Sequence, residues 1–323
     1  MMLQKLNRTL DKSIPFITPL SVILGILIAN YVNNYTFLIP WLFAFMTFEG
    51  SLSLNFRDLT EAIRRPLPVF IILSFLHIIM PLITWVIARL TFPEDSLTMT
   101  GLILGMVIPT GITSFIWVSM KRGNQALTLS VIIIDAILAP FLVPLSLSIL
   151  VGQKVELDMW QMMTSLFFMI VLPSIVALLL NEITKGNTGK IWKPRFSPIS
   201  KLFLCGVLLL NGAEVAPYFQ TFNWKLVYIM VIVIVVTFIG YFLAFVLGRV
   251  LQFPKPSLVS LTFGGGMRNV SAGAVIAVTF FPSAVVLPVV VSMLFQQIIA
   301  SIFATILDSV DENESVNSEE LIA

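Results

Sequence analysis

The 323-residue chain is short of charged residues, cysteine and histidine. Charged residues make up 11% of the sequence and hydrophobic residues 58%, whereas soluble domains carry about 25% charged residues. A chain with so few polar groups cannot cover a water-facing surface, so we expect it to use lipid as its solvent. The single Cys205 excludes an intramolecular disulfide and a cysteine-based metal cluster. The single His77 excludes histidine-rich metal sites and most histidine-based catalysis.

Enzyme motifs are missing as well. The sequence has no glycine-rich phosphate loop ending in Lys-Ser/Thr, no paired metal motif and no Ser/His/Asp set with a histidine in a suitable place. Basic residues are confined almost entirely to short loops, so the formal net charge of +2 does not indicate a nucleic-acid partner. We therefore expect a membrane protein that is not an enzyme and that uses no cofactor beyond a coupling ion, Na+ or H+.

Apolar runs long enough to cross a bilayer recur along the whole chain. A span needs about 20 apolar residues to cross roughly 30 Å of hydrocarbon. The apolar run that follows the polar, basic residues 1–12 is long enough for a first membrane helix, so we expect no cleavable signal peptide. We predict ten spans, at residues 14–32, 36–54, 68–92, 98–120, 125–150, 160–181, 200–218, 226–251, 256–281 and 283–306.

The distribution of lysine and arginine predicts the orientation of these spans, because cytoplasmic loops carry an excess of both residues. With a cytoplasmic N-terminus, 15 of the 19 basic residues lie in inside loops and three lie outside, namely Arg89, Lys154 and Lys225, while Arg268 lies within a span. We therefore expect an integral protein of the bacterial cell membrane with both termini in the cytoplasm.

A short polar link at residues 152–158 divides the ten predicted spans into two sets of five, at residues 14–150 and 160–306. Because five is odd, the two sets have opposite orientations, which is the inverted-repeat architecture of many secondary transporters. We expect one transporter domain over residues 1–306. Residues 307–323 hold six of the 17 acidic residues, and we expect them to form a disordered cytoplasmic tail.

Polar and glycine-rich stretches interrupt the fourth span of each half, at residues 108–114 and 263–271. Pro109 removes a backbone donor, and Gly111 permits backbone angles that other residues avoid, as do Gly264, Gly265 and Gly266. Half-helices beginning near Thr113 and near Arg268 would present N–H groups to an anion, while carbonyl groups would hold a cation. The alternative is that proline and glycine only kink these helices for packing.

Two charged residues lie deep within predicted spans. Arg268 and Asp135 each cost about 2.5–3.5 kcal/mol at the centre of a membrane helix, so each needs a partner or a wet cavity. One hypothesis is that the two neutralise each other across a binding site, and the alternative is a purely structural pair. His77 would titrate near neutrality if it were hydrated. A neutral histidine bonded to a neighbouring helix is the other interpretation.

Six segments carry a resemblance to a known family, namely Phe45–Leu59, Ile79–Leu82, Pro109–Ser114, Arg122–Thr128, Phe263–Asn269 and Met293–Gln297. Together they resemble the bile acid:sodium symporter superfamily, and the resemblance covers nearly the whole chain. It implies ten helices with a panel domain (spans 1, 2, 6 and 7) and a core domain (spans 3–5 and 8–10), in which two broken helices cross. It also implies transport of small or amphipathic organic anions, driven inward by sodium.

The breaks, the buried charges and this resemblance together predict the residues that bind substrate or ion. They are Thr110, Thr113, Ser114, Thr128, Asp135, Arg268, Asn269, Ser271, His77 and Gln296. No metal site is assigned.

The chain departs from the family at the implied sodium ligands. The family's Glu and Gln in the second break are Gly264 and Arg268 here, its Asn in the first break is Phe115, and a hydroxyl on the following helix is Ile132, although Thr128 keeps its oxygen. A hard cation needs several oxygen ligands. We therefore hypothesise that the Arg268 guanidinium replaces a sodium ion as a tethered cation. Transport would then be sodium-independent, or proton-linked through Asp135 or His77.

Two functions are alternatives to organic anion transport. The arsenite efflux permeases are similar along residues 115–119 but use a cysteine at the first break, where this chain has Thr110. A non-transporting membrane receptor or sensor would account for lost sodium ligands, but it leaves the retained breaks and Arg268 without a role. The residues alone identify neither the substrate nor an oligomeric state.

Overall fold

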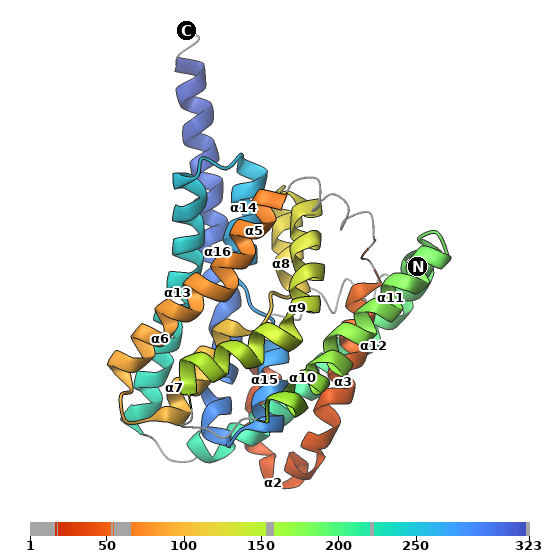
Figure 1. Ribbon diagram of the computed structural model, residues 1–323, viewed down its shortest axis with the longest axis vertical. Coiled ribbons are helices and arrows are strands. Elements are labelled where there is room, and N and C mark those ends of the chain that lie inside the picture. Colours follow the sequence, from red (N-terminus) through yellow and green to blue (C-terminus); the bar gives the residue numbers. More distant parts are fainter. Residues whose placement is uncertain are drawn as a thin grey trace.

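The computed structural model describes residues 17, 19–52, 54, 66–152, 158–219 and 223–320, and within these ranges every regular element is a helix (Figure 1). The predicted all-α class is confirmed. A helix at Pro19–Leu27 comes first. The labelled elements follow it as α2 (Ala29–Val32), η1 (Asn33–Leu38), α3 (Ile39–Ser51), α5 (Pro66–Ser74), η2 (Phe75–Ile79), α6 (Met80–Thr91), α7 (Ser96–Val107), α8 (Ile112–Met120), α9 (Gln125–Val151), α10 (Met159–Leu166), η4 (Phe167–Val171), α11 (Leu172–Ile183), α12 (Asn187–Phe219), α13 (Trp224–Val250), α14 (Lys255–Gly266), α15 (Val270–Phe280) and α16 (Ser283–Glu320).

Six helical segments are long and apolar enough to cross a membrane. Two further helix pairs pass the same test but are bent, by 84° between Pro19–Leu27 and Ala29–Ser51 and by 54° between α7 and α8, which raises the number of spans to at most eight. The ten predicted spans differ from this count in two places. The first two predicted spans form one bent pair here, and the predicted span at 256–281 is divided into α14 and α15, of 12 and 11 residues.

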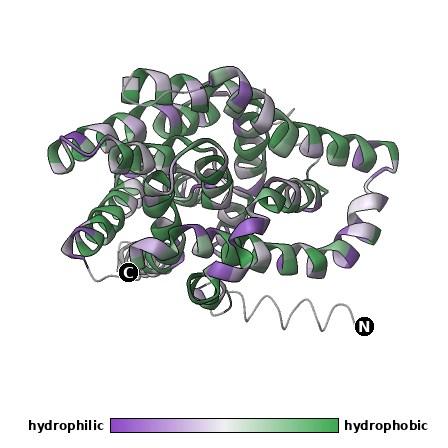
Figure 2. Cartoon of the chain, turned by 90° about the horizontal axis from the view of Figure 1, so that it is seen from below, coloured by the Kyte–Doolittle hydropathy of each residue, from purple (hydrophilic) through white to green (hydrophobic). Residues whose placement is uncertain are grey.

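The outer surface of the bundle is apolar. Large side chains such as Trp41, Leu90 and Ile149 are 70% or more exposed, and hydrophobic residues cover most of the helices in Figure 2. Because exposed apolar area on this scale is unfavourable in water, these side chains face lipid. The prediction of an integral membrane protein is confirmed.

The helices pack in two groups around the two breaks. On one side α3 packs against α11 and α12, whereas on the other α13 packs against α14 and α16. Between them α7 and α15 are buried along most of their lengths. Small residues allow this packing, since a Cβ on Gly101 of α7 would lie 2.4 Å from the Val285 oxygen of α16. The breaks that follow α7 and precede α15 are therefore enclosed by protein.

The C-terminal helix α16 continues to Glu320, where the sequence led us to expect a disordered tail. Figure 1 shows this end of α16 projecting beyond the bundle. Extending an existing helix adds one hydrogen bond per residue without a new nucleation step, so a spanning helix extends readily into a polar segment. Residues 321–323 lie outside the described ranges, as do residues 1–16.

Candidate substrate and ion site at two helix breaks

The first break separates α7 from α8. Helix α7 ends at Val107, and Ile108 is extended (φ −62°, ψ 149°) because the proline that follows disfavours helical angles. Gly111 is also extended (φ −109°, ψ 162°), and α8 begins at Ile112, one residue before the predicted Thr113. The break therefore spans residues 108–111 and includes Pro109 and Thr110.

The second break separates α14 from α15. Met267 is extended (φ −97°, ψ 133°), and α15 begins at Val270, slightly later than predicted. The Oδ1 atom of Asn269 accepts a hydrogen bond from the Ala272 N–H at 3.2 Å and so caps α15. Both breaks lie within the stretches that the sequence analysis predicts for them.

The role expected for three glycines in the second break is wrong. Gly264, Gly265 and Gly266 form the last turn of α14 and do not have unusual backbone angles. They are required by packing instead, because a Cβ on Gly266 would lie 2.4 Å from the Tyr241 ring and one on Gly265 would lie 2.9 Å from the Ala244 Cβ. Their absent side chains let α13 approach the end of α14.

The two breaks contact each other directly. The Asn269 N–H donates to the Pro109 oxygen at 2.8 Å, and the Thr110 Oγ1 donates to the Met267 oxygen at 3.1 Å. A Cβ on Gly111 would lie 3.3 Å from the Cα of Asn269, so glycine allows this approach. Unpaired backbone groups in hydrocarbon cost several kcal/mol each. Each break supplies partners that the other lacks.

Gln296 of α16 bonds the unwound backbone of the second break from both directions. Its Oε1 accepts from the Arg268 N–H at 2.9 Å, and its Nε2 donates to the Arg268 oxygen at 3.1 Å. The amide of Gln296 thus supplies the two hydrogen bonds that the backbone N–H and C=O of Arg268 would make inside a continuous helix. Gln296 was predicted as a binding residue, and in this structure its polar atoms are used by the backbone.

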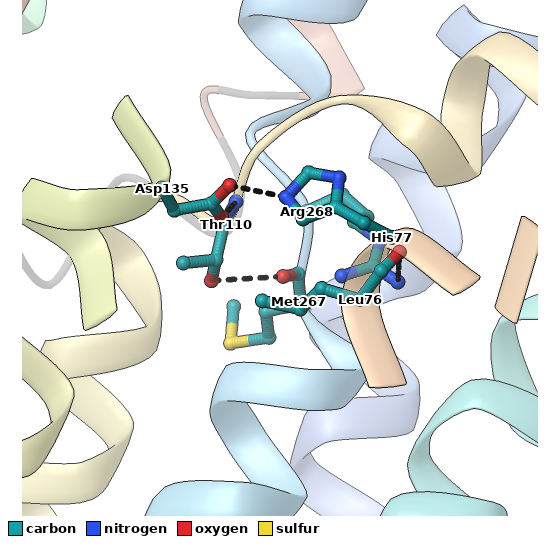
Figure 3. Close-up of polar contacts among 6 residues, drawn as sticks. All are labelled: Leu76, His77, Thr110, Asp135, Met267 and Arg268. Carbon is teal, nitrogen blue, oxygen red and sulfur yellow. Dashed lines mark hydrogen bonds and ion pairs between the residues drawn. The ribbon is translucent and has the colours of Figure 1, made fainter. Parts of the chain in front are cut away.

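Asp135 is fully buried in α9 and bridges two other elements. Its Oδ1 lies 2.6 Å from the Nε2 of His77 in η2, and its Oδ2 accepts from the Thr110 N–H at 2.7 Å. Figure 3 shows the carboxylate between these two groups. The hypothesised direct pair between Asp135 and Arg268 is not formed among the described residues, because both carboxylate oxygens have other partners. The two charges attract each other at longer range.

Arg268 is 1% exposed. Its Nη2 lies 3.5 Å from the Leu76 oxygen, which is a weak hydrogen bond, while its Nε and Nη1 have no hydrogen-bond partner within the described protein. Leu76 and His77 are adjacent in η2, a short π-helix, so this segment contacts both buried charges. Short π-helices often occur at functional sites.

We call the place where the two breaks contact each other the crossing. A cavity of about 450 Å³ lies beside it. It is lined by residues of α3, α8, α9, α11 and α12 and by both breaks. The predicted residues Thr110, Thr113, Asn269 and Ser271 line it, whereas Arg268 and His77 do not. The crossing therefore has a cavity side and a sealed side.

The charged residues of the cavity were not among the predicted binding residues. Lys193 and Lys201 line the cavity together with Glu49 and supply its charged groups. We had placed both lysines in a cytoplasmic loop, but α12 begins at Asn187, well before the predicted start of the span, and its first turns border the cavity. One sequence signal could have placed both lysines in the cavity. They are eight residues apart, which puts them on the same face of a helix that begins before the apolar run.

Besides Arg268 and His77, four predicted residues do not line the cavity, namely Ser114, Thr128, Asp135 and Gln296. Thr128, in the first turn of α9, donates to the Asn124 oxygen and lies 3.0 Å from the Ser260 hydroxyl, so it links α9 to α14. Ser114 is fully buried, and its hydroxyl bonds the Gly111 oxygen at 2.7 Å. Among the described residues, no group of three or more His, Cys, Asp and Glu side chains is arranged to hold a metal ion.

Comparisons with known proteins identify the family of this chain. The family model described as the Sodium Bile acid symporter family matches residues 40–222. The "Uncharacterized protein YbaS" of Bacillus subtilis (strain 168) is 47% identical over 294 residues, which cover 91% of this chain and 96% of that protein.

Two more distant relatives have names that refer to transport. The "Uncharacterized sodium-dependent transporter YocS" of the same bacterium is 24% identical, over 84% of this chain and 85% of that protein. The "Probable sodium/metabolite cotransporter BASS2, chloroplastic" of Oryza sativa subsp. japonica is 26% identical, over 83% of this chain and 64% of that protein. The extent of the family match and the identity to the first relative show that this chain is a membrane transporter protein of the sodium bile acid symporter family.

Proposed function

We propose that the chain is a secondary transporter of organic anions that works by alternating access. The observation that carries this proposal is the cavity that ends at the crossing of two broken helices. Substrates of secondary transporters bind near the bilayer midplane, beside discontinuous helices. We further propose the ten-span inverted repeat, in which the helices of spans 1, 2, 6 and 7 (Pro19–Leu27 to α3, and α10–α12) form the panel. Those of spans 3–5 and 8–10 (α5–α9 and α13–α16) form the core. The cavity then lies between panel and core.

The access side of the cavity follows from the same topology. Leu54 after α3, Leu178 of α11 and Lys193 of α12 line it near the ends that the basic-residue count assigns to the cytoplasm. The Thr110 and Asn269 of the breaks form its inner end. In our proposal this arrangement is the inward-facing state, and transport requires the panel and core to move so that the breaks are reached from outside.

The cavity walls favour an amphipathic or small organic anion. Most lining residues are apolar, including Phe43, Ile133 and Phe115, and the charged lining residues give a net charge of +1 from two lysines and Glu49. Helices α8 and α15 also begin at the cavity, and the N-terminal end of a helix attracts negative charge. A volume of about 450 Å³ is within the usual range of about 300–1,000 Å³ for ligand pockets.

Arg268 supports transport without sodium. Its guanidinium is buried at the second break, and the sequence lacks most of the oxygen ligands that the family resemblance implies for sodium. We propose that this tethered cation takes the electrostatic role of a sodium ion, although two relatives have sodium in their names. Metalloid export is less well supported, because Cys205 of α12 is not among the residues that line the cavity.

A two-stage experiment tests this function. Thermal-shift measurements with bile salts, steroid sulfates, pantoate-like acids and oxo-acids, each with and without sodium, identify stabilising anions. The best anion is then followed as radiolabel in proteoliposomes of the full chain. We expect anion stabilisation and uptake without sodium. Stabilisation only by a neutral amphiphile would overturn the anion assignment, and sodium-dependent uptake that is unchanged in Arg268→Gln would overturn the tethered-cation assignment. Binding without flux would indicate a receptor.

A further inference from the structure

The sealed side of the crossing contains a buried acid–base pair. The His77 side chain is 7% exposed and that of Asp135 is 0% exposed, and their Nε2 and Oδ1 atoms lie 2.6 Å apart. Asp135 also accepts from the Thr110 N–H, and an ionised carboxylate accepts both bonds. The neutral imidazole then carries its proton on Nε2 and donates it to the carboxylate.

This arrangement leaves one nitrogen of the imidazole open to a proton. The buried Nδ1 of His77 has no hydrogen-bond partner within the described protein. In the tautomer with a proton on Nε2, the Nδ1 lone pair is unused. A proton that binds at Nδ1 forms an N–H bond and converts imidazole to imidazolium while the bond from Nε2 to Asp135 is kept. No oxidant, reductant or other reactant is involved.

The charged groups around the pair link the binding of this proton to the binding of a monovalent anion. Arg268 is the buried cation that faces it, and Tyr241 of α13 lies beside Arg268. On the described elements packed against α9 and η2, the ionisable residues Arg89 and Lys255 lie at helix ends. With His77 neutral, the charges of Asp135 and Arg268 sum to zero. A bound proton makes the sum +1, and a monovalent anion restores it to zero.

The pair is also connected to the cavity. The peptide of Thr110 donates to Asp135 on one side, and Thr110 lines the cavity on the other. Ala136, which follows Asp135 in α9, lines the cavity too. Loss or gain of charge at the pair therefore acts on the backbone that a substrate anion would approach.

We propose that the His77–Asp135 pair binds a coupling proton and that the proton and one organic anion are carried together. This inference rests on the proposed function and names its coupling ion. Binding of either charge favours the other, because the buried site holds neither a net positive nor a net negative charge once both are bound. Release of the anion on the opposite side favours release of the proton from Nδ1. The complete cycle moves no net charge.

The single histidine of the chain allows a direct test of proton binding that needs no substrate. The full-length protein is labelled with ¹⁵N-histidine and followed by NMR in detergent across about pH 5–8, the range in which histidines titrate. We expect the Nδ1 signal of His77 to change from that of a bare nitrogen to that of an N–H, with Nε2 protonated throughout. An Asp135→Asn variant should lose this tautomer preference, whereas Asp95→Asn, which removes a carboxylate at a distant helix cap, should not.

Transport gives the second readout. The anion selected by thermal shift is offered to proteoliposomes with an imposed pH gradient and with an imposed potassium diffusion potential. One pH unit should drive about tenfold accumulation, because it is a tenfold ratio of proton activity, and the potential should have no effect. His77→Gln should keep anion exchange between two equal pools and lose accumulation.

The outcomes separate this inference from the proposed function. Anion exchange that ignores the pH gradient, or an Nδ1 signal that is constant over the titration, overturns the proton site and leaves the transporter in place. Absence of flux for every anion that stabilises the protein overturns the proposed function itself. Accumulation by His77→Gln equal to that of the parent would assign the coupling proton elsewhere.

Discussion

The two sides of the helix crossing are built from the same backbone but are opposite in character. On the cavity side, Thr110, Asn269 and Ser271 line a space of about 450 Å³ that two lysines also line. On the sealed side, Asp135 and Arg268 are almost completely buried, and Gln296 supplies backbone hydrogen bonds. In our proposal, the cavity side binds the substrate anion and the sealed side binds the proton that accompanies it.

Removal of Asp135 should cause the largest loss of stability and transport, because this carboxylate is fully buried and bonds two other elements. Asp135→Leu leaves the Thr110 N–H without its partner and Arg268 without a compensating charge. Each buried hydrogen-bonding group left unpaired costs about 1–3 kcal/mol, and the uncompensated charge of Arg268 adds to this cost. We expect a large fall in the melting temperature and no uptake. Asp135→Asn keeps an acceptor for Thr110 and should lose less stability. If Asp135→Leu unfolds at the parent's temperature, the sealed side does not depend on this charge.

Gln296 tests the backbone support of the second break. Gln296→Leu unpairs the Arg268 N–H and C=O, and each unpaired buried group costs about 1–3 kcal/mol. The neighbouring Gln297 is a matched control, because its Oε1 accepts only an exposed bond from the Trp117 indole. Thermal unfolding of Gln297→Leu should resemble that of the parent. Equal destabilisation by the two substitutions would assign the effect of Gln296 to general packing of α16.

Lysine substitutions test the cavity side. Lys201→Gln should raise the KM for the transported anion about tenfold, equivalent to about 1.4 kcal/mol, and leave thermal stability nearly unchanged. Lys193→Gln should act in the same direction, because Lys193 lines the same cavity. Lys190→Gln is the control, since Lys190 is on the same helix but does not line the cavity. Equal KM values for Lys201→Gln and Lys190→Gln would show that Lys201 does not contribute to substrate binding.

Local chemistry made the breaks predictable from sequence. Pro109 forces Ile108 out of the helix, so the first break was assigned correctly, and the starts of α8 and α15 lie within two residues of their predicted positions. The start of the second break was predicted four residues too early, because Gly264, Gly265 and Gly266 were assigned to it. The depths of Asp135 and Arg268 also followed from the lengths of the apolar runs around them. Membership of the transporter family was likewise predicted from the motifs in and near these breaks.

Partners distant in sequence could not be predicted in the same way. The hypothesis that Asp135 and Arg268 neutralise each other rests on opposite charge, whereas the fold places Asp135 against His77, 58 residues away. The role of the glycines of α14 could not be predicted either. Gly266 is required because the Tyr241 ring, on another helix, leaves no room for a side chain. The sequence analysis places Lys193 and Lys201 in a loop because the first turns of α12 are polar. Hydropathy marks only the apolar part of a spanning helix, so it does not show that the helix begins earlier, at Asn187.

The smallest effect should come from a carboxylate that belongs to neither side of the crossing. Asp95 caps α7 by accepting from the Thr98 N–H at 3.1 Å and pairs with Lys225 at 2.8 Å, in the loop between α6 and α7. Burial raises the pKa of Asp95, but hydrogen bonds from Lys225 and Thr98 together with the lysine charge outweigh burial and lower the pKa below 3.8. The stabilisation is therefore present at neutral pH and lost as the pH falls through the lowered value.

Asp95→Asn keeps a capping oxygen and removes only the charge, so thermal unfolding of this variant and of the parent isolates the ion pair. We expect a difference of less than about 1 kcal/mol at neutral pH, as for other partly exposed pairs, and no difference in strong acid. Added salt should reduce it further. Because the pair lies far from both sides of the crossing, uptake should be unchanged at neutral pH. A loss of transport here would mean that this loop takes part in the conformational change, and the division between an anion-binding side and a proton-binding side would be incomplete.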